Sequence, residues 1–451
     1  MNSDAHHQNK TKIPRNVIAL GLVSLFTDAA TEMIYPLVPL FVTFLGSTAV
    51  ILGVIEGVAE TTAAMLKLIS GIISDKIGKR KPLVLIGYGI STLIRPFTGI
   101  VSAAWQIVFI RMTDRVGKGI RTAPRDALIA SSVDDHIRGK AYGFHRAMDH
   151  TGAVIGPFLA LLALGFLVLV YHMQNTLSIL RWTFLLSLIP GLFAVLTIVF
   201  FVHEKAAPSS ASKTMNFSLR QFDRNFIKYL GVIILFTLGN SSDAFLLFRV
   251  QEAIHQSQNL YVRIYALPFA GDIVRAFGDS EAQKRVIDML FIPLVWAFFH
   301  VIKVIFSTPL GALSDRIGRK IVINIGWAIY AFVYFAFAFL DRLPNHLEVP
   351  GTFVLFAVYA LYYAFSEGAE KAFVADLVQP GQLGSAFGLY NFAVGLAALP
   401  ASVVFGVLYY RFGAIAAFGT GAVIACLSMA LFGMTIKEPN KHPPQVIEER
   451  Q

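Results

Sequence analysis

The chain has 451 residues, of which 55% are hydrophobic and only 15% are charged. Soluble proteins carry about 25% charged residues, so this composition argues against a soluble protein and for one with many membrane-spanning helices. The formal net charge is +10, but the cations gather between apolar segments and not on one amphipathic face, which argues against a nucleic-acid partner.

Twelve apolar segments follow one another along the chain, and each is long enough to span a membrane, which takes about 20 residues. Those of the first half are residues 17–43, 49–73, 83–101, 103–120, 140–170 and 180–202. Those of the second half are residues 229–249, 287–310, 321–340, 351–373, 383–408 and 413–435. The segments 103–120 and 140–170 carry charged residues inside the apolar run, so they are the least clear of the twelve.

Polar stretches divide the chain around these segments. We predict an N-terminal tail at 1–16, a first six-helix bundle at 17–202, a linker at 203–227, a second bundle at 228–435 and a C-terminal tail at 436–451. The first tail lacks the apolar core of a signal peptide, so the first helix is expected to direct insertion. Residues 251–286 form an excursion after the seventh segment, and two interpretations stay open: a short amphipathic helix at the membrane face, or a plain loop.

Lysine and arginine mark every second loop. Lys76, Lys79 and Arg80 follow the second segment, whereas the short loop VSAAW after the third has no cation. Because cytoplasmic loops carry the excess of Lys and Arg, we predict a multi-pass protein of the bacterial inner (plasma) membrane. Both termini and the linker are then expected to be cytoplasmic.

A phrase of the first half returns in the second. Residues 71–82 read GIISDKIGKRKP and residues 311–322 read GALSDRIGRKIV, which places Asp75 and Asp315 240 positions apart. The glycine before each aspartate lets two helices approach, and the cations after it hold the loop at the cytoplasmic face. Two copies of a six-helix unit in the same orientation are one of the repeat designs of transporters.

In these two phrases the chain resembles the major facilitator superfamily, whose loop signatures lie between helices two and three and between helices eight and nine. The resemblance covers nearly the whole chain. It implies an all-α membrane protein of twelve transmembrane helices, arranged as two six-helix bundles around a central cavity. It also implies a conformational latch at Gly71, Asp75, Gly78, Arg80, Gly311, Asp315, Gly318 and Arg319. The residues by themselves support only a basic turn.

Glycines recur in the fifth segment as Gly143, Gly152 and Gly156, followed by Pro157. This spacing resembles the helix-five motif of proton-coupled drug and solute antiporters in the same superfamily. That motif usually ends in two glycines, where this chain has Ala160 and Leu161. Close packing of an ordinary membrane helix, bent at the proline, is the alternative interpretation.

Ionisable residues inside apolar segments cost free energy unless they pair or face water, so each is a functional candidate. We predict proton coupling by Asp28, Glu32, Arg111, Arg146 and Asp149. Of these, Arg111 falls where the resemblance implies an arginine linked to proton coupling. The predicted substrate cavity adds Arg115, Asp243, Glu367, Glu370, Tyr390 and Asn391. A structural ion pair is the alternative for each, and it is the favoured interpretation for Glu56, Lys67, Arg95 and Lys303.

The sequence predicts a secondary active transporter that moves a small polar or amphiphilic solute by alternating access, through proton-coupled export. A proton-coupled importer and a non-transporting receptor or scaffold of the same fold are the alternatives. The chain has no Walker-type Gly-Lys-Ser/Thr and no dinucleotide-binding loop, so we expect no direct use of ATP, no enzyme activity and no cofactor. His145 and His150 are poorly spaced for one metal ion, and no metal site is expected. The expected partners are the solute, protons and the lipid bilayer, with the protein acting as a monomer.

Overall fold

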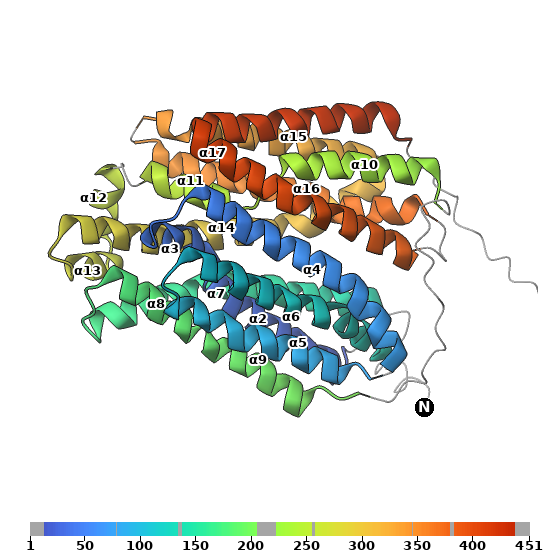
Figure 1. The fold of residues 1–451 in the computed structure, drawn as a ribbon, viewed down its shortest axis with the longest axis horizontal. Helices are drawn as coiled ribbons and strands as arrows, with labels where there is room; N and C mark the ends of the chain where they lie inside the picture. Colours follow the sequence, from blue (N-terminus) through green and yellow to red (C-terminus); the bar gives the residue numbers. More distant parts are fainter. Residues whose placement is uncertain are drawn as a thin grey trace, which may run out of the picture.

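The structure is a computed structural model that describes residues 13–77, 79–133, 138–204, 222–254, 258–344, 346–378 and 383–437. Within these ranges the regular structure is entirely helical. The long helices run roughly along one direction of the molecule and form two bundles, one from each half of the chain (Figure 1).

The first bundle holds six membrane-length helices. The first is α2 (Arg15–Glu32), continued through the 3₁₀ turn η2 (Tyr35–Leu37) into α3 (Val38–Phe44). The others are α4 (Ala49–Ile77), α5 (Lys81–Ile94) with the turn η3 (Arg95–Ile100), α6 (Ala104–Ser131), α7 (Arg138–Leu169), and α8 (Thr176–Leu186) with α9 (Leu188–Phe201). Pro36 and Pro39 lie at the break in the first helix, where the missing N–H of proline interrupts the helical hydrogen bonds.

The second bundle is built in the same way. It contains α10 (Arg224–Gly239) with α11 (Ala244–Ile254), α14 (Ser280–Ile317), α15 (Arg319–Ala338), α16 (Glu348–Asp376) and α17 (Leu383–Thr435). Helix α17 bends at Gly413, whose φ of 79° and ψ of −179° lie outside the helical region. Glycine tolerates this positive φ, so α17 supplies two membrane crossings.

Twelve helices therefore cross the bundles within the described ranges. Ten stretches are long and apolar enough to span a membrane. The fourth helix, α6, is not one of these ten, because charged residues interrupt its apolar run. The two arms of α17, on either side of Gly413, form a single stretch among the ten. Counting α6 and the second arm of α17 raises ten to twelve, which confirms the predicted fold.

The two halves share a pair of contacts at one end of the molecule. The Asn16 side chain accepts from the N–H of His203 at 2.9 Å, and the Asn225 side chain accepts from the N–H of Lys437 at 3.0 Å. In each half this bond joins the start of the first helix to the chain just after the sixth. We call this end the linker end, because α9 ends there and α10 begins there (Figure 1, right).

A second pair of contacts repeats at the linker end. The ammonium group of Lys81 donates to the carbonyl of Val199 at 3.2 Å, and that of Lys320 donates to the carbonyl of Gly433 at 2.7 Å. Each lysine thus binds a free carbonyl in the last turn of the sixth helix of its half, where cations are favourable. These paired contacts show in the folded chain the duplication that the sequence phrases predict.

Glycines bring helices of the two halves close together. A Cβ built on Gly53 of α4 would lie 2.3 Å from the carbonyl oxygen of Ser402 on α17, and one on Gly57 would lie 2.8 Å from the Cα of Leu399. Inside the first bundle, a Cβ on Gly152 of α7 would lie 2.3 Å from the carbonyl oxygen of Leu25 on α2. The helix-five glycines therefore permit close packing, while their antiporter role stays a prediction.

The excursion after the seventh helix is helical where the structure describes it. It contains α12 (Gln258–Ala266) and α13 (Ala270–Arg275), which lie at the end opposite the linker (Figure 1, left). Exposed apolar side chains on and after α12 include Val262 and Leu267. In the described residues, α10 begins at Arg224, inside the predicted linker, and α14 begins at Ser280, inside the predicted excursion. The domain boundaries otherwise stay predictions.

Candidate functional site

A polar cavity of about 500 Å³ lies between the two bundles. Its walls come from α2, α4, α6 and α7 of the first half and from α10, α14, α16 and α17 of the second. It brings together eight of the side chains predicted for proton coupling or substrate binding: Asp28, Glu32, Arg115, Arg146, Asp149, Asp243, Glu367 and Asn391. The other three, Arg111, Glu370 and Tyr390, lie outside its lining.

Asp28 lies on α2 with its half-buried side chain at the cavity wall. Among the described residues, no donor hydrogen-bonds to its carboxylate and no cation lies within ion-pairing distance. The charges that act on it come from Glu32 on the same helix, from Lys118 and Arg121 on α6, and from Asp149 on α7. An unpaired carboxyl group at membrane depth that faces a polar cavity is suited to a proton relay.

Glu32, one turn further along α2, is held by the second bundle. The indole Nε1 of Trp296 on α14 donates to its Oε2 at 2.7 Å. The ring of Trp296 also lies 5.3 Å from that of Tyr35. This part of the cavity wall is therefore a contact between the two halves.

Two ion pairs join α4 to α6. The Nη2 atom of Arg111 lies 2.9 Å from Oε1 of Glu56, and Nη2 of Arg115 lies 3.2 Å from Oε1 of Glu60. The first pair is buried, and Ser242 of the second bundle donates to the other oxygen of Glu56 at 3.1 Å. Arg111 is thus fixed behind the cavity wall by Glu56, whereas Glu60 and Arg115 both line the cavity.

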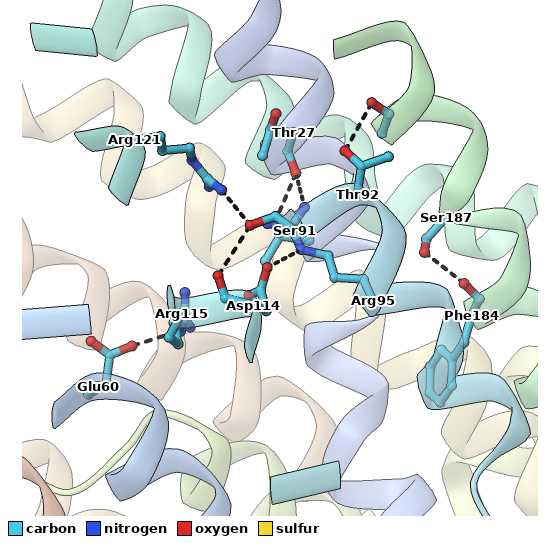
Figure 2. A network of polar contacts seen from close by, with 12 residues as sticks. Thr27, Glu60, Ser91, Thr92, Arg95, Asp114, Arg115, Arg121, Phe184 and Ser187 are labelled. Carbon is cyan, nitrogen blue, oxygen red and sulfur yellow. Dashed lines mark hydrogen bonds and ion pairs between the residues drawn. The ribbon is translucent and has the colours of Figure 1, made fainter. Parts of the chain in front are cut away.

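Asp114 anchors α5 to α6 (Figure 2). Arg95 donates from Nε to Oδ1 of Asp114 at 2.8 Å and from Nη1 to the carbonyl of Thr27 at 3.1 Å. Arg121 donates to Oγ of Ser91 at 2.6 Å. This buried network ties three helices of the first bundle together, as the structural interpretation of Arg95 predicts.

The carboxylate of Glu367 on α16 lies close to cationic side chains from both bundles. Its carboxylate lies 3.3 Å from Nζ of Lys303, 3.7 Å from Nζ of Lys371 and 3.9 Å from Nη2 of Arg146. Arg146, on α7, is shared, because its Nη1 also lies 3.4 Å from Oδ2 of Asp149. The guanidinium of Arg146 therefore lies between a carboxylate of the first bundle and one of the second.

Asp243 sits at the break between α10 and α11 and is held by neutral donors. The hydroxyl of Tyr359 donates to Oδ1 at 2.5 Å, and that of Tyr363 lies 3.0 Å from both carboxylate oxygens.

His300, which also lines the cavity, is 8% exposed. Both of its ring nitrogens are buried and lack a partner among the described residues.

Glu370 and Tyr390 bind each other inside the second bundle. The Tyr390 hydroxyl donates to Oε2 of Glu370 at 2.8 Å, and the indole Nε1 of Trp327 donates to Oε1 at 2.8 Å. These bonds link α15, α16 and α17, away from the cavity lining. In this conformation the arrangement supports packing and not contact with a solute.

Only part of the predicted latch falls within the described residues. Gly78 lies outside them, and the structure does not describe the side chains of Asp75 and Asp315. Gly71 and Gly311 lie in the last turns of α4 and α14, and Gly318 forms the bend between α14 and α15 with a φ of 101°.

The two arginines of the predicted latch bind at the linker end. The backbone N–H of Arg80 donates to Oε1 of Glu204 at 2.5 Å, and Arg319 pairs with Asp376. Each arginine therefore contacts its own bundle, and the latch role stays a prediction.

Several lining residues were not singled out from the sequence. They are Tyr35, Lys118, Arg121, Trp296 and Tyr363. A signal for Lys118 is present in the sequence, because Arg111, Arg115 and Lys118 follow one another at helical spacing on one face. Within the ranges described, no group of three His, Cys, Asp or Glu side chains is placed to hold a metal ion.

The model of the Major Facilitator Superfamily matches the chain twice, over residues 20–278 and 260–451. An uncharacterised MFS-type transporter of Methanocaldococcus jannaschii is 31% identical over 428 residues, which cover 95% of this chain and 96% of that protein. The chain belongs to the major facilitator superfamily. It is thus a multi-pass membrane transporter that works by alternating access between its two bundles.

Other likenesses are more distant. The multidrug resistance efflux pump PmrA of Streptococcus pneumoniae is 27% identical over 196 residues, which cover 43% of this chain and 46% of the pump. A D-xylose–proton symporter has a TM-score of 0.66 at 15% identity, covering 94% of this chain and 98% of that one. The nucleoside transporter NupG has a TM-score of 0.64 at 14% identity, covering 92% and 97%. At these identities the two solved structures show the fold alone.

Proposed function

We propose that the protein is a proton-coupled exporter of the bacterial inner membrane that carries a small zwitterionic or anionic solute. The observation that supports this most is the polar cavity between the bundles, with the unpaired carboxylate of Asp28 in its wall. The partial likeness to an efflux pump supports export. We propose a monomer with both termini in the cytoplasm, as the loop cations indicate.

The charges that line the cavity are balanced. Its carboxylates are Asp28, Glu32, Glu56, Glu60, Asp149, Asp243 and Glu367. Its lysines and arginines are equal in number: Lys67, Arg95, Arg115, Lys118, Arg121, Arg146 and Lys303. A solute with charges of both signs finds partners here without changing the net charge of the cavity. A purely apolar solute would gain little from such a lining.

Asp28 is the proposed site of exchange between proton and solute. A cationic group of the solute can take the place of the proton beside this carboxylate, because no protein cation occupies that place among the described residues. The proton and the solute then use the carboxylate in turn. Alternating use of one charged group couples export of the solute to entry of the proton.

The structure corresponds to one end of the transport cycle. At the end opposite the linker, the two halves touch: Gln251 of α11 donates to Oγ1 of Thr43 at 3.1 Å, and the Arg285 guanidinium lies 5.3 Å from the ring centre of Phe44. With the linker end in the cytoplasm, these contacts close the cavity on the outside. We therefore propose that this conformation loads solute from the cytoplasm.

The test uses everted membrane vesicles that carry a proton gradient, acid inside, reported by a pH-sensitive dye. A panel of amino acids, dipeptides and organic acids is added in turn. We expect at least one solute to dissipate the gradient with the parent protein, and Asp28→Asn to abolish the response at equal protein amounts. The matched control is Asp272→Asn, because Asp272 is exposed on α13, outside the membrane-spanning helices, where it binds Arg275.

Two results would contradict the proposal. One is a gradient that no solute of the panel changes with the parent protein. The other is an Asp28→Asn variant that responds as the parent and the Asp272→Asn control do.

A further inference from the structure

Charged side chains of α4 and α6 face each other at successive levels along the two helices. We call each level, with one side chain from each helix, a rung. The first two rungs pair an acid with a base: Glu56 with Arg111, and Glu60 with Arg115 (the second pair is visible in Figure 2). The next charged side chains toward the linker end on these faces are two lysines, Lys67 and Lys118. Both line the central cavity.

The packing of the two helices places these lysines at the same level. A Cβ built on Gly119 of α6 would lie 2.4 Å from the Cβ of Leu66 on α4, and Ser70 Oγ donates to the carbonyl of Gly119 at 2.7 Å. Lys67 follows Leu66 in the chain, and Lys118 precedes Gly119. The close contact at Gly119 therefore holds the backbone positions of the two lysines at one level of the helix pair.

Neither lysine has an acidic partner among the described residues, since no carboxylate there lies within ion-pairing distance of either ammonium group. The charges of Arg115 and Lys67 act on Lys118 by repulsion, and those of Glu60 and Asp28 by attraction. Glu60 is already bound to Arg115. The third rung is thus a pair of like charges in the wall of the cavity.

A lysine of the other bundle adds to the positive charge that acts on Lys67. Lys371 of α16 acts on Lys67 by repulsion, and its own ion pair is with Glu367, 3.7 Å away. Like charges held together at low dielectric are unfavourable unless an anion lies between them or one of them loses its proton. Since the site opens to the cavity, an anion from solution can reach it.

We propose that Lys67 and Lys118 form an anion seat that binds the acidic group, carboxylate or phosphate, of the transported solute. This rests on the proposed function, because the seat lies in the cavity through which the solute passes. It assigns the acidic group of such a solute to two named side chains of the cavity wall. A zwitterion bound in this way has its cationic group free to approach Asp28, whose charge also acts on Lys118.

The experiment measures thermal unfolding of the purified, detergent-solubilised protein. Sodium acetate and sodium phosphate are titrated at constant ionic strength against sodium chloride. We expect one or both to raise Tm by about 2–4 °C at saturation, as ligands that bind only the folded state do. The larger shift identifies the acidic group that the seat prefers.

Three variants decide whether the seat is responsible. Lys67→Gln and Lys118→Gln are each expected to remove the anion-dependent shift, whereas Lys228→Gln, an exposed lysine on α10, is expected to keep it. Lys67→Glu replaces the like-charged rung by an acid–base pair. In the absence of acetate and phosphate, we expect this variant to have a higher Tm than the parent. We expect neither anion to change the Tm of the variant.

Two outcomes would overturn the proposal: no shift beyond that of chloride with the parent protein, or the same shift with Lys67→Gln as with the parent. The measurement needs no proton gradient. If anions raise the Tm but no solute dissipates the proton gradient in vesicles, the anion seat is supported and proton coupling is not. A working vesicle assay with no shift removes the seat and leaves proton-coupled export.

Discussion

The indole Nε1 of Trp296 lies 2.7 Å from Oε2 of Glu32, and this hydrogen bond crosses from α14 of the second bundle to α2 of the first. It lies in the cavity wall, next to the tilted ring contact of Trp296 with Tyr35. Because the bundles of an alternating-access transporter move against each other, the bond holds in this conformation and must break in the opposite one.

We expect Trp296→Phe to shift the protein toward the opposite conformation. A hydrogen bond to a charged group contributes about 1.5–3 kcal/mol, so the population of that conformation should rise roughly ten- to hundredfold. The chain has one cysteine, Cys426, which is replaced by serine. The readout is then labelling of Thr43→Cys in that background by an impermeant maleimide added at the end opposite the linker. Trp105→Phe, at an exposed position on α6, is the matched control. Equal labelling of the two variants would show that the bond does not hold the closed end.

A second prediction concerns the glycine contact between α4 and α17. In Gly53→Ala the new methyl group would lie 2.3 Å from the carbonyl oxygen of Ser402, too close for α17 to keep its place. We expect a loss of about 1–3 kcal/mol in stability and a loss of transport. Gly89→Ala on α5 meets nothing within 4 Å, so alanine should be neutral there or stabilise the helix by about 0.5–1 kcal/mol. Denaturant unfolding of both variants compares them directly, and equal midpoints would refute the packing argument.

Apolar run length and loop charge predicted the helices well, with two instructive differences. Helix α6 was predicted at 103–120 but extends to Ser131, because its polar residues face other helices and the cavity, which hydropathy cannot show. For residues 251–286 the sequence did not decide between a short helix and a loop, and the structure has the helices α12 and α13 there. The sequence contains the amphipathic pattern, but the packing that stabilises such short helices is a tertiary property.

The site was predicted in part, for a similar reason. Because a charge inside a membrane costs free energy, Asp28 and Asp243 are candidate functional residues, and both line the cavity. The same rule marks Glu370 equally, yet Trp327 and Tyr390 bind its carboxylate inside the second bundle, outside the cavity lining that contains Glu367. Which side of a helix faces the cavity depends on its neighbours. For Lys118 the helical spacing with Arg111 and Arg115 is visible in the sequence, but its position opposite Lys67 requires the packing of α4 beside α6.

A third prediction separates structural from functional roles for Arg111. In Arg111→Gln the buried carboxylate of Glu56 loses its cation, which typically costs about 3–5 kcal/mol. In the double variant Glu56→Gln with Arg111→Gln no buried charge is left unpaired, and we expect much of the stability to return. Thermal unfolding of the two singles and the double gives the coupling energy. Additive losses would mean that the 2.9 Å contact contributes nothing to folding.

The last prediction tests how Asp243 is kept in the wall of the cavity. In the part of the chain that the structure describes, its carboxylate accepts side-chain hydrogen bonds from two tyrosine hydroxyls, those of Tyr359 at 2.5 Å and Tyr363 at 3.0 Å. Removing one donor from a buried carboxylate should cost about 1.5–3 kcal/mol, so Tyr359→Phe and Tyr363→Phe are both expected to lower the unfolding midpoint. The double variant should lose more than the sum, because the carboxylate is then left without a donor.

The two tyrosines differ in what else they touch, which gives the test its second readout. Tyr363 lines the cavity and lies under the ammonium group of Lys303, 4.2 Å from the ring centre, whereas Tyr359 is fully buried. Tyr363→Phe keeps the ring and should leave the place of Lys303 unchanged, but it removes a hydroxyl that a solute can reach. We therefore expect it to weaken solute-driven dissipation of the proton gradient more than Tyr359→Phe does at equal protein amounts. Tyr410→Phe, at an exposed position of α17, should change neither stability nor transport, and a Tyr359→Phe variant that unfolds with the Tyr410→Phe midpoint would show that Asp243 does not depend on this donor.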